Sequence, residues 1–169
     1  MSMKTLRTLI LFGTLLVFLY LVNTGIWSAE QNIADGQPVY LILAPVDPRS
    51  LIQGDYMRLD YQIERDATND GLLEVERGQI VARLDENNVA HYARLYTTGE
   101  SLADNEILLN FTTSEFGGVR IGVDSFFFQE GQASRYNAAR YADVRVTEGG
   151  TIMLVDLVGE NFEDLADDN

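Results

Sequence analysis

The residue types that most enzymes use for catalysis are scarce in this chain. It has no cysteine, one histidine, His91, and one lysine, Lys4. Thiolate nucleophiles and zinc–thiolate sites are therefore excluded by inventory. A Ser/Lys dyad is excluded as well, because no lysine follows the apolar segment near the N-terminus.

The remaining candidates for chemistry have ordinary structural explanations. His91 falls in phase with Val89 and Leu95 on a predicted strand, which favours a satisfied, half-buried histidine over a catalytic one. Residues 66–71 begin like a calcium loop, but Arg77 stands where that loop needs a bidentate glutamate. The 26 acidic residues guarantee close carboxylate pairs in any fold, so carboxylate chemistry is neither indicated nor excluded. We expect no catalytic residue, no metal site and no cofactor.

The charge of the chain argues against nucleic acid as a partner. Two of the twelve cations, Lys4 and Arg7, precede the apolar segment, so ten arginines face 26 acids beyond it, a formal charge of −16. Such a surface repels phosphate backbones. We favour solubility or adaptation to salt as the explanation of this acidity.

An apolar segment near the N-terminus predicts a membrane anchor. Residues 8–27 carry no charge, and 20 helical residues span roughly 30 Å of hydrocarbon. Lys4 and Arg7 precede the segment and the next cation is Arg49, so residues 1–7 are expected in the cytoplasm and the rest outside it. Cleavage as a signal peptide after Ala29 is the alternative. It would place the bulky Trp27 three residues before the cut, so we favour an uncleaved anchor.

The exported part is expected to contain a linker, 28–37, one periplasmic or otherwise extracytoplasmic domain, 38–158, and an acidic tail, 159–169. Within the domain, Val39 to Val46 is an apolar run typical of a strand covered on both faces, and Asp55 to Ile63 alternates like a half-buried strand. Six more strands are expected, at 79–85, 89–96, 107–112, 119–128, 144–147 and 152–158.

Short turns separate several of these strands, and one helix is predicted. Turn residues at 86–88, 114–118 and 148–150 favour hairpins, and the spacing of alanine, tyrosine and arginine between Gln132 and Ala142 favours a short helix. We therefore expect a mainly β fold. It is an antiparallel barrel or a strongly twisted sheet of about eight strands with one short helix, preceded by a single transmembrane helix.

One motif gives a family resemblance. Gly54 to Tyr61 reads GDYMRLDY and resembles the signature after which the GDYXXLXY family of membrane-anchored proteins is named. Further stretches are similar to the lead-in and second block of that family, at 46–51, 122–127, 130–131 and 136–145. The resemblance implies a membrane-anchored protein of a family without established activity, with a partner among multi-pass membrane proteins.

The signature has a structural interpretation. Gly54 suits a positive φ in the turn, and Leu59 and Tyr61 occupy the core-facing register of the strand. Asp55 stands beside the turn, where its carboxylate suits capping or an arginine pair better than a ligand contact. Tyr56 points the opposite way.

Two functions follow from these residues. The first is a non-enzymatic module that binds or assembles with another envelope or multi-pass membrane protein. The second is a small-ligand-binding or hydrolytic domain with a carboxylate, arginine and tyrosine cluster in a barrel mouth, which requires Asp55, Glu130 and Arg140 to converge. The candidate binding residues are Asp55, Tyr56, Arg58, Glu130 and Arg140.

Overall fold

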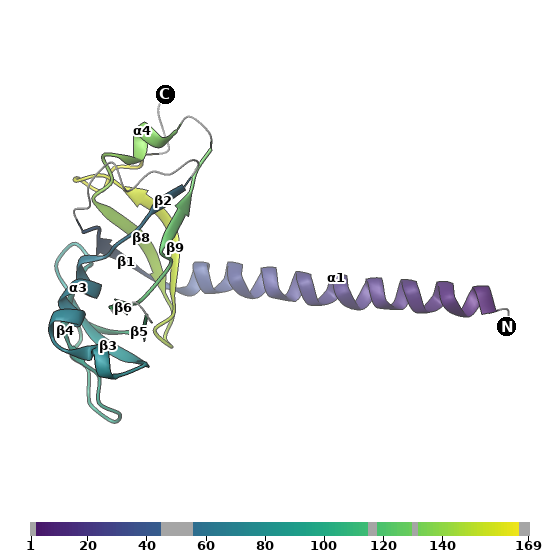
Figure 1. Cartoon of the computed structure of the whole chain (residues 1–169), viewed down its shortest axis with the longest axis horizontal. Coiled ribbons are helices and arrows are strands. Elements are labelled where there is room, and N and C mark those ends of the chain that lie inside the picture. Colours follow the sequence, from purple (N-terminus) through teal and green to yellow (C-terminus); the bar gives the residue numbers. More distant parts are fainter. Residues whose placement is uncertain (1–2, 45–55, 115–117, 130–131, 166–169) are drawn as a thin grey trace. The chain divides into compact units, whose positions relative to one another are not determined.

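The computed structural model describes the backbone of residues 3–44, 56–114, 118–129 and 132–165. The chain divides into two compact units, Met1–Asp35 and Gly36–Asn169. The described part of the first unit is a helix, and the strands lie in the second (Figure 1).

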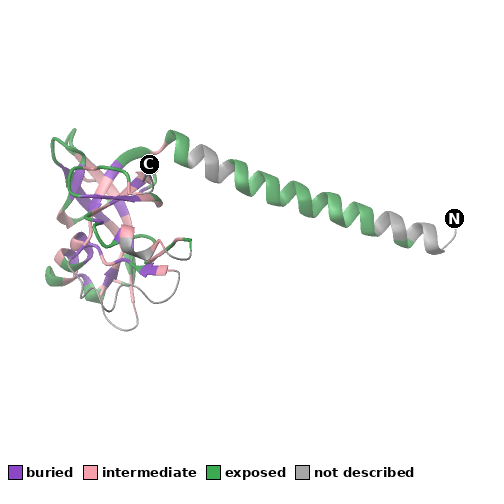
Figure 2. Ribbon diagram, turned by 90° about the horizontal axis from the view of Figure 1, so that it is seen from above, coloured by how far each residue is buried: buried purple, intermediate pink, exposed green. Residues whose placement is uncertain are grey.

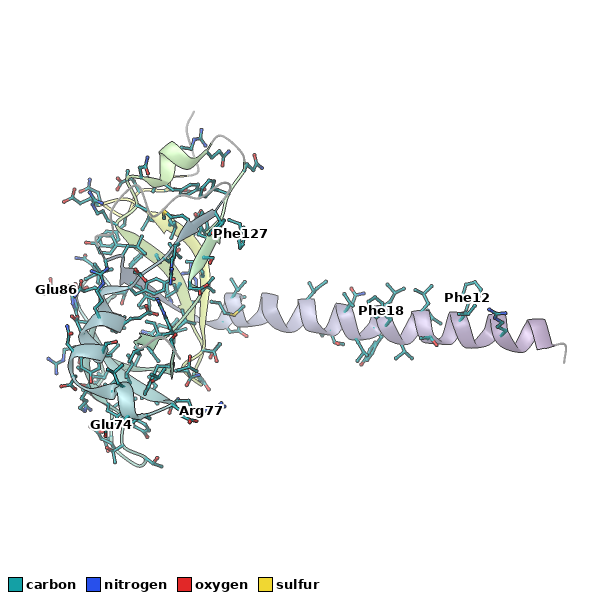
Figure 3. The ribbon with its side chains drawn as sticks, in the orientation of Figure 1. Phe12, Phe18, Glu74, Arg77, Glu86 and Phe127 are labelled. Carbon is teal, nitrogen blue, oxygen red and sulfur yellow. The ribbon has the colours of Figure 1, made fainter. Side chains whose placement is uncertain are left out.

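The helix of the first unit is α1 (Met3–Asp35). Its described apolar side chains are exposed (Figure 2), and Phe12 and Phe18 project from it in Figure 3. The stretch expected to be a linker, 28–37, is helical as far as Asp35, because no proline or glycine interrupts it before Gly36. Among the described residues, no helix combines the length and the apolar character needed to cross a membrane.

A curled sheet forms the body of the second unit. Its seven strands run in the order β6-β5-β3-β4-β1-β8-β9, and every neighbouring pair is antiparallel except β1 with β4. The strands of this sheet are β1 (Gln37–Ile42), β3 (Arg77–Leu84), β4 (Val89–Leu95), β5 (Glu106–Thr113), β6 (Val119–Arg120), β8 (Tyr141–Val146) and β9 (Ile152–Val158).

Smaller elements complete the second unit. A separate two-stranded sheet pairs β2 (Tyr56–Arg58) with β7 (Ser125–Phe127). The helices are α3 (Gln62–Asn69), the 3-10 helix η1 (Leu72–Glu74) and α4 (Ala133–Tyr136). The prediction of a mainly β fold is confirmed, with nine strands and two short α-helices in the described part of this unit.

The hairpins predicted from turn residues are present. β3 and β4 pair on either side of residues 85–88, and β8 and β9 pair on either side of residues 147–151. β1 is central in the sheet, and Val39 and Leu41 are fully buried in the core. Tyr40 and Ile42 are only half-buried, so β1 is covered unequally on its two faces.

The predicted strand 55–63 is wrong in its second half. β2 ends at Arg58, and α3 begins at Gln62. The alternation of apolar residues continued to Ile63, but Ile63 and Ala67 are four residues apart and are both buried on one face of α3. Helical spacing therefore overrides strand alternation from this point.

The predicted strand 119–128 is also divided. β6 pairs with β5, whereas β7 pairs with β2 in the other sheet. Gly122 lies between them, where a Cβ would lie 3.5 Å from Ile152. That distance is an ordinary van der Waals contact, so the space around Gly122 does not itself require a glycine.

Hydrogen bonds from β5 to the β8–β9 turn hold the sheet in a half-barrel curl. The backbone N–H of Asn110 donates to the carbonyl of Gly150 at 2.8 Å, and its side-chain amide donates to the carbonyl of Gly149 at 2.9 Å. The side-chain amide of Gln79 also donates to Gly149, at 3.3 Å. Since β5 and β9 stand near opposite ends of the strand order, these bonds join the two ends of the sheet.

Gly150 is expected to be sensitive to substitution. Its φ is 80°, and a Cβ would lie 3.0 Å from the carbonyl oxygen of Leu108. Gly99 has a similar φ of 89° but nothing within 4 Å of that Cβ position. Gly150→Ala should lower the free energy of unfolding by about 2 kcal/mol and Gly99→Ala by about 1 kcal/mol, as chemical denaturation measures them. Equal losses of unfolding free energy in the two variants would mean that β5 does not hinder a Cβ at position 150.

Candidate functional site

Three predicted site residues, Gly54, Asp55 and Glu130, lie outside the described residues. Of the others, Arg140 is exposed and its Nη1 donates to the carbonyl of Ala139 at 3.4 Å. Among the described residues, no hydrogen bond, ion pair or ring contact joins the Arg140 side chain to residues 56–61 of the signature. The pocket that a small-ligand-binding or hydrolytic domain would need at these residues therefore stays a prediction.

The end of the signature is part of the core. Leu59 is 1% exposed, and its N–H donates to the carbonyl of Asp124 at 2.9 Å. Tyr61 is equally buried, and its hydroxyl donates to the carbonyl of Val123 at 2.8 Å. Burial, with the charges of Glu64 and Asp124, raises the pKa of the Tyr61 hydroxyl, so it stays neutral at physiological pH. These two residues fasten the signature to the segment before β7.

A buried carboxylate follows the signature. Glu64, on α3, is 5% exposed. Its Oε1 accepts the N–H of Ile121 at 2.9 Å, and its Oε2 accepts a hydrogen bond from Nη1 of Arg120 at 3.1 Å. Burial raises the pKa of the Glu64 carboxyl, whereas the Ile121 N–H and Arg120 act in the opposite direction. Glu64 thus ties α3 to β6.

Asp60 shares the same arginine. Nη1 of Arg120 donates to Oδ1 of Asp60 at 3.0 Å, so a single guanidinium nitrogen serves two carboxylates. Arg65 approaches Oδ2 of Asp60 only to 3.9 Å. We call these four side chains, Asp60, Glu64, Arg65 and Arg120, the acid–arginine cluster.

A cavity of about 310 Å³ adjoins the acid–arginine cluster. The hydroxyl of Thr68 donates to the carbonyl of Glu64 at 2.7 Å and accepts the N–H of Val119 at 2.9 Å, which fixes the wall between α3 and β6. The complete lining is Asp60, Tyr61, Glu64, Arg65, Thr68, Asn69, Gly118, Val119 and Arg120.

Sequence reasoning missed this cluster. The expected strand 55–63 concealed it, because Asp60 precedes α3 and Glu64 lies on that helix, which begins at Gln62. Nothing local indicates that Arg120, 56 residues beyond Glu64, completes it.

A second feature is aromatic and lies on the β2–β7 sheet. Tyr56 and Phe127 pair across the two strands, with their ring centroids 5.8 Å apart. Phe127 is 75% exposed, and Figure 3 shows it projecting from the ribbon. Phe126 and Phe128, on either side of it, instead pack on Tyr136 with ring centroids 4.9 and 5.4 Å away. Tyr56 and Phe127 together form what we call the aromatic pair.

Other charged side chains form separate pairs. Nη1 of Arg94 donates to Oε1 of Glu106 at 2.7 Å, and this bond lowers the pKa of the Glu106 carboxyl to about 2. His91 is exposed rather than half-buried, and its Nε2 lies 3.5 Å from Oδ2 of Asp85. Within the described ranges, no three side chains of histidine, cysteine, aspartate or glutamate gather where they would hold a metal ion.

The fold and these residues define a half-barrel β domain in which the signature, Gly54 to Tyr61, contributes Asp60 to the acid–arginine cluster, and Glu64 is the buried member of that cluster. The chain belongs to the family described as GDYXXLXY protein, whose model matches residues 18–157. That match begins inside α1 and ends within β9. No curated protein and no solved structure matches the chain.

Proposed function

We propose that this protein is a membrane-anchored, extracytoplasmic β domain that binds or assembles with another envelope or multi-pass membrane protein and is not itself an enzyme. The observation that carries the proposal is the exposure of Phe127 beside Tyr56. A large aromatic ring in water loses the free energy that burial would provide, and such rings are enriched where proteins meet.

The pairing of the polar groups supports a non-enzymatic role. Both carboxylate oxygens of Glu64 accept hydrogen bonds, from Arg120 and from the N–H of Ile121. The Tyr61 hydroxyl donates a hydrogen bond to a backbone carbonyl. The only histidine stands exposed beside Asp85. A general base needs a free lone pair near a substrate site, whereas both oxygens of Glu64 accept hydrogen bonds that hold α3 to the segment at Arg120 and Ile121.

The proposal of an anchor rests on the run of uncharged residues in the sequence of α1 and on their exposure. Residues 8–27 are uncharged, and the described apolar side chains from Leu11 to Trp27 are exposed along the helix. A row of exposed apolar side chains is stable where lipid surrounds it. Lys4 and Arg7 precede these residues, which favours a cytoplasmic N-terminus and an extracytoplasmic second unit.

The topology gives the first test. Protease added to intact spheroplasts is expected to degrade residues 36–169, because that unit faces outward, and to leave residues 1–7 protected. Immunoblotting with tags at the two ends distinguishes these fragments. Protection of the C-terminal tag until the spheroplasts are lysed would contradict the orientation.

The aromatic pair gives the second test. Phe127→Ser should reduce recovery of crosslinked partner from membranes about tenfold, the effect of removing an interface residue worth more than 1 kcal/mol. The melting temperature should change little, because the Phe127 ring is exposed. Leu73→Ser, at another exposed apolar residue, is the matched control and should leave recovery unchanged. Equal recovery with Phe127→Ser and the wild type would refute the assignment.

A further inference from the structure

Several acceptors around the cavity already take part in hydrogen bonds within the domain. Glu64 accepts from Ile121 and Arg120, Asp60 accepts from Arg120, and the hydroxyl of Thr68 both donates and accepts. A ligand that brought further donors would compete with these bonds for the oxygens of Glu64 and Thr68.

Few donors of Arg65 and Arg120 bond to the residues that the structure describes. Arg120 donates to both carboxylates through Nη1, and its Nε and Nη2 donate no hydrogen bond to the described residues. The side chain of Arg65 is 45% exposed, and its only ion pair with the described residues is the 3.9 Å approach to Asp60. A guanidinium offers five N–H donors in a planar fork. As far as the described residues are concerned, most of the donor capacity of Arg65 and Arg120 is therefore unused.

We propose that this cavity binds a small oxyanion, either a carboxylate or a phosphate, through the free donors of Arg120 and Arg65. This site is independent of the aromatic pair proposed above as the protein contact. Arginine binds planar carboxylates and phosphate oxygens through two parallel hydrogen bonds, so the free edge of Arg120 suits either group.

The arrangement of charge explains how an acidic domain accepts an anion here. Asp60 and Glu64 both bond Nη1, which leaves the Nε and Nη2 edge of Arg120 turned away from that shared nitrogen. The two arginines balance the two carboxylates, so the cluster carries no net negative charge even when Glu64 is ionised. Burial also favours the neutral form of Glu64, which reduces repulsion of an anion further.

The size of the cavity limits the ligand. A volume of about 310 Å³ lies at the lower end of the range for small-molecule sites, so the ligand is a small metabolite or an inorganic ion. Thr68 and Val119 fix the wall, and the site therefore needs little rearrangement to accept it.

Titration of the full-length protein in detergent with acetate or inorganic phosphate, at constant ionic strength, tests the proposal. NMR of arginine side-chain N–H groups is expected to show saturable 1:1 binding to Arg65 and Arg120. Tighter binding of acetate would identify the natural ligand as a carboxylate, and tighter binding of phosphate would identify it as a phosphate.

Arg65→Gln should weaken that binding about tenfold, as expected for the loss of a charge-assisted hydrogen bond. Its exposed side chain makes this variant compatible with folding, whereas a change at Arg120 would also disturb Glu64. Arg77→Gln is the matched control, because Arg77 is exposed and is not part of the cavity lining. Absence of saturable binding in the wild type, or equal weakening by Arg77→Gln, would overturn the proposal.

Discussion

Truncation of Leu59 to alanine is expected to lower the free energy of unfolding by about 2 to 5 kcal/mol. Leu59 is almost completely buried and belongs to the main hydrophobic cluster, so the truncation leaves a cavity between β2 and the core. A typical domain has only about 5 to 15 kcal/mol of stability, and Leu59→Ala should lower the melting temperature markedly.

Leu73 provides the matched control for this substitution. It lies on η1 and is 48% exposed, so Leu73→Ala should change the free energy of unfolding by about 0.5 kcal/mol or less. Denaturant titration of the two variants compares the same chemical change at a buried and an exposed site. Equal losses would show that the leucine of the signature is not a core residue.

Replacement of Arg120 by methionine is expected to cost about 3 kcal/mol, the lower end of the range for breaking a buried ion pair. The arginine is partly exposed, but its partner Glu64 is not, and the variant leaves that carboxylate buried without its cation. The double variant Arg120→Met with Glu64→Leu should recover part of the loss, because the buried carboxylate of Glu64 is then absent, while the Ile121 N–H loses its acceptor and Asp60 keeps only the approach of Arg65.

The pH dependence of stability separates this electrostatic effect from lost packing. Because the pKa of Glu64 is raised, the folded protein holds a proton at pH values where the unfolded chain has released it. The stability due to protonated Glu64 is therefore complete below the ordinary glutamate pKa and is lost as pH rises through the folded pKa. Arg120→Met should raise that pKa further, so its stability deficit should shrink on acidification. A deficit that does not change with pH would indicate lost packing alone.

Elements set by local patterns were predictable from the sequence. The β3–β4 and β8–β9 hairpins follow from alternating strands and short polar turns, which depend on neighbouring residues only. The segment after Arg58 was mistaken because Leu59, Tyr61 and Ile63 alternate like a strand, although Ile63 and Ala67 also satisfy helical spacing. Periodicity alone does not decide between the two readings in so short a stretch.

The candidate sites could not be predicted, because they are formed by contacts between residues that lie far apart in the sequence. Arg120 meets Glu64 only because α3 packs beside β6, and Asn110 meets Gly150 only because the sheet curls. Strand alternation separates Phe127 from Phe126 and Phe128, but the packing of those two rings on Tyr136 decides which face is exposed.

Site-specific photo-crosslinking from residue 127 in intact membranes tests the central proposal most directly. A photoreactive phenylalanine at position 127 retains the exposed ring that the proposal places against a partner. The same group at position 77, also exposed, serves as the control. The proposal predicts one discrete crosslinked envelope or membrane protein from position 127 and none of it from position 77. A folded, membrane-bound variant that gives no crosslink from position 127, or the same products from both positions, would contradict it.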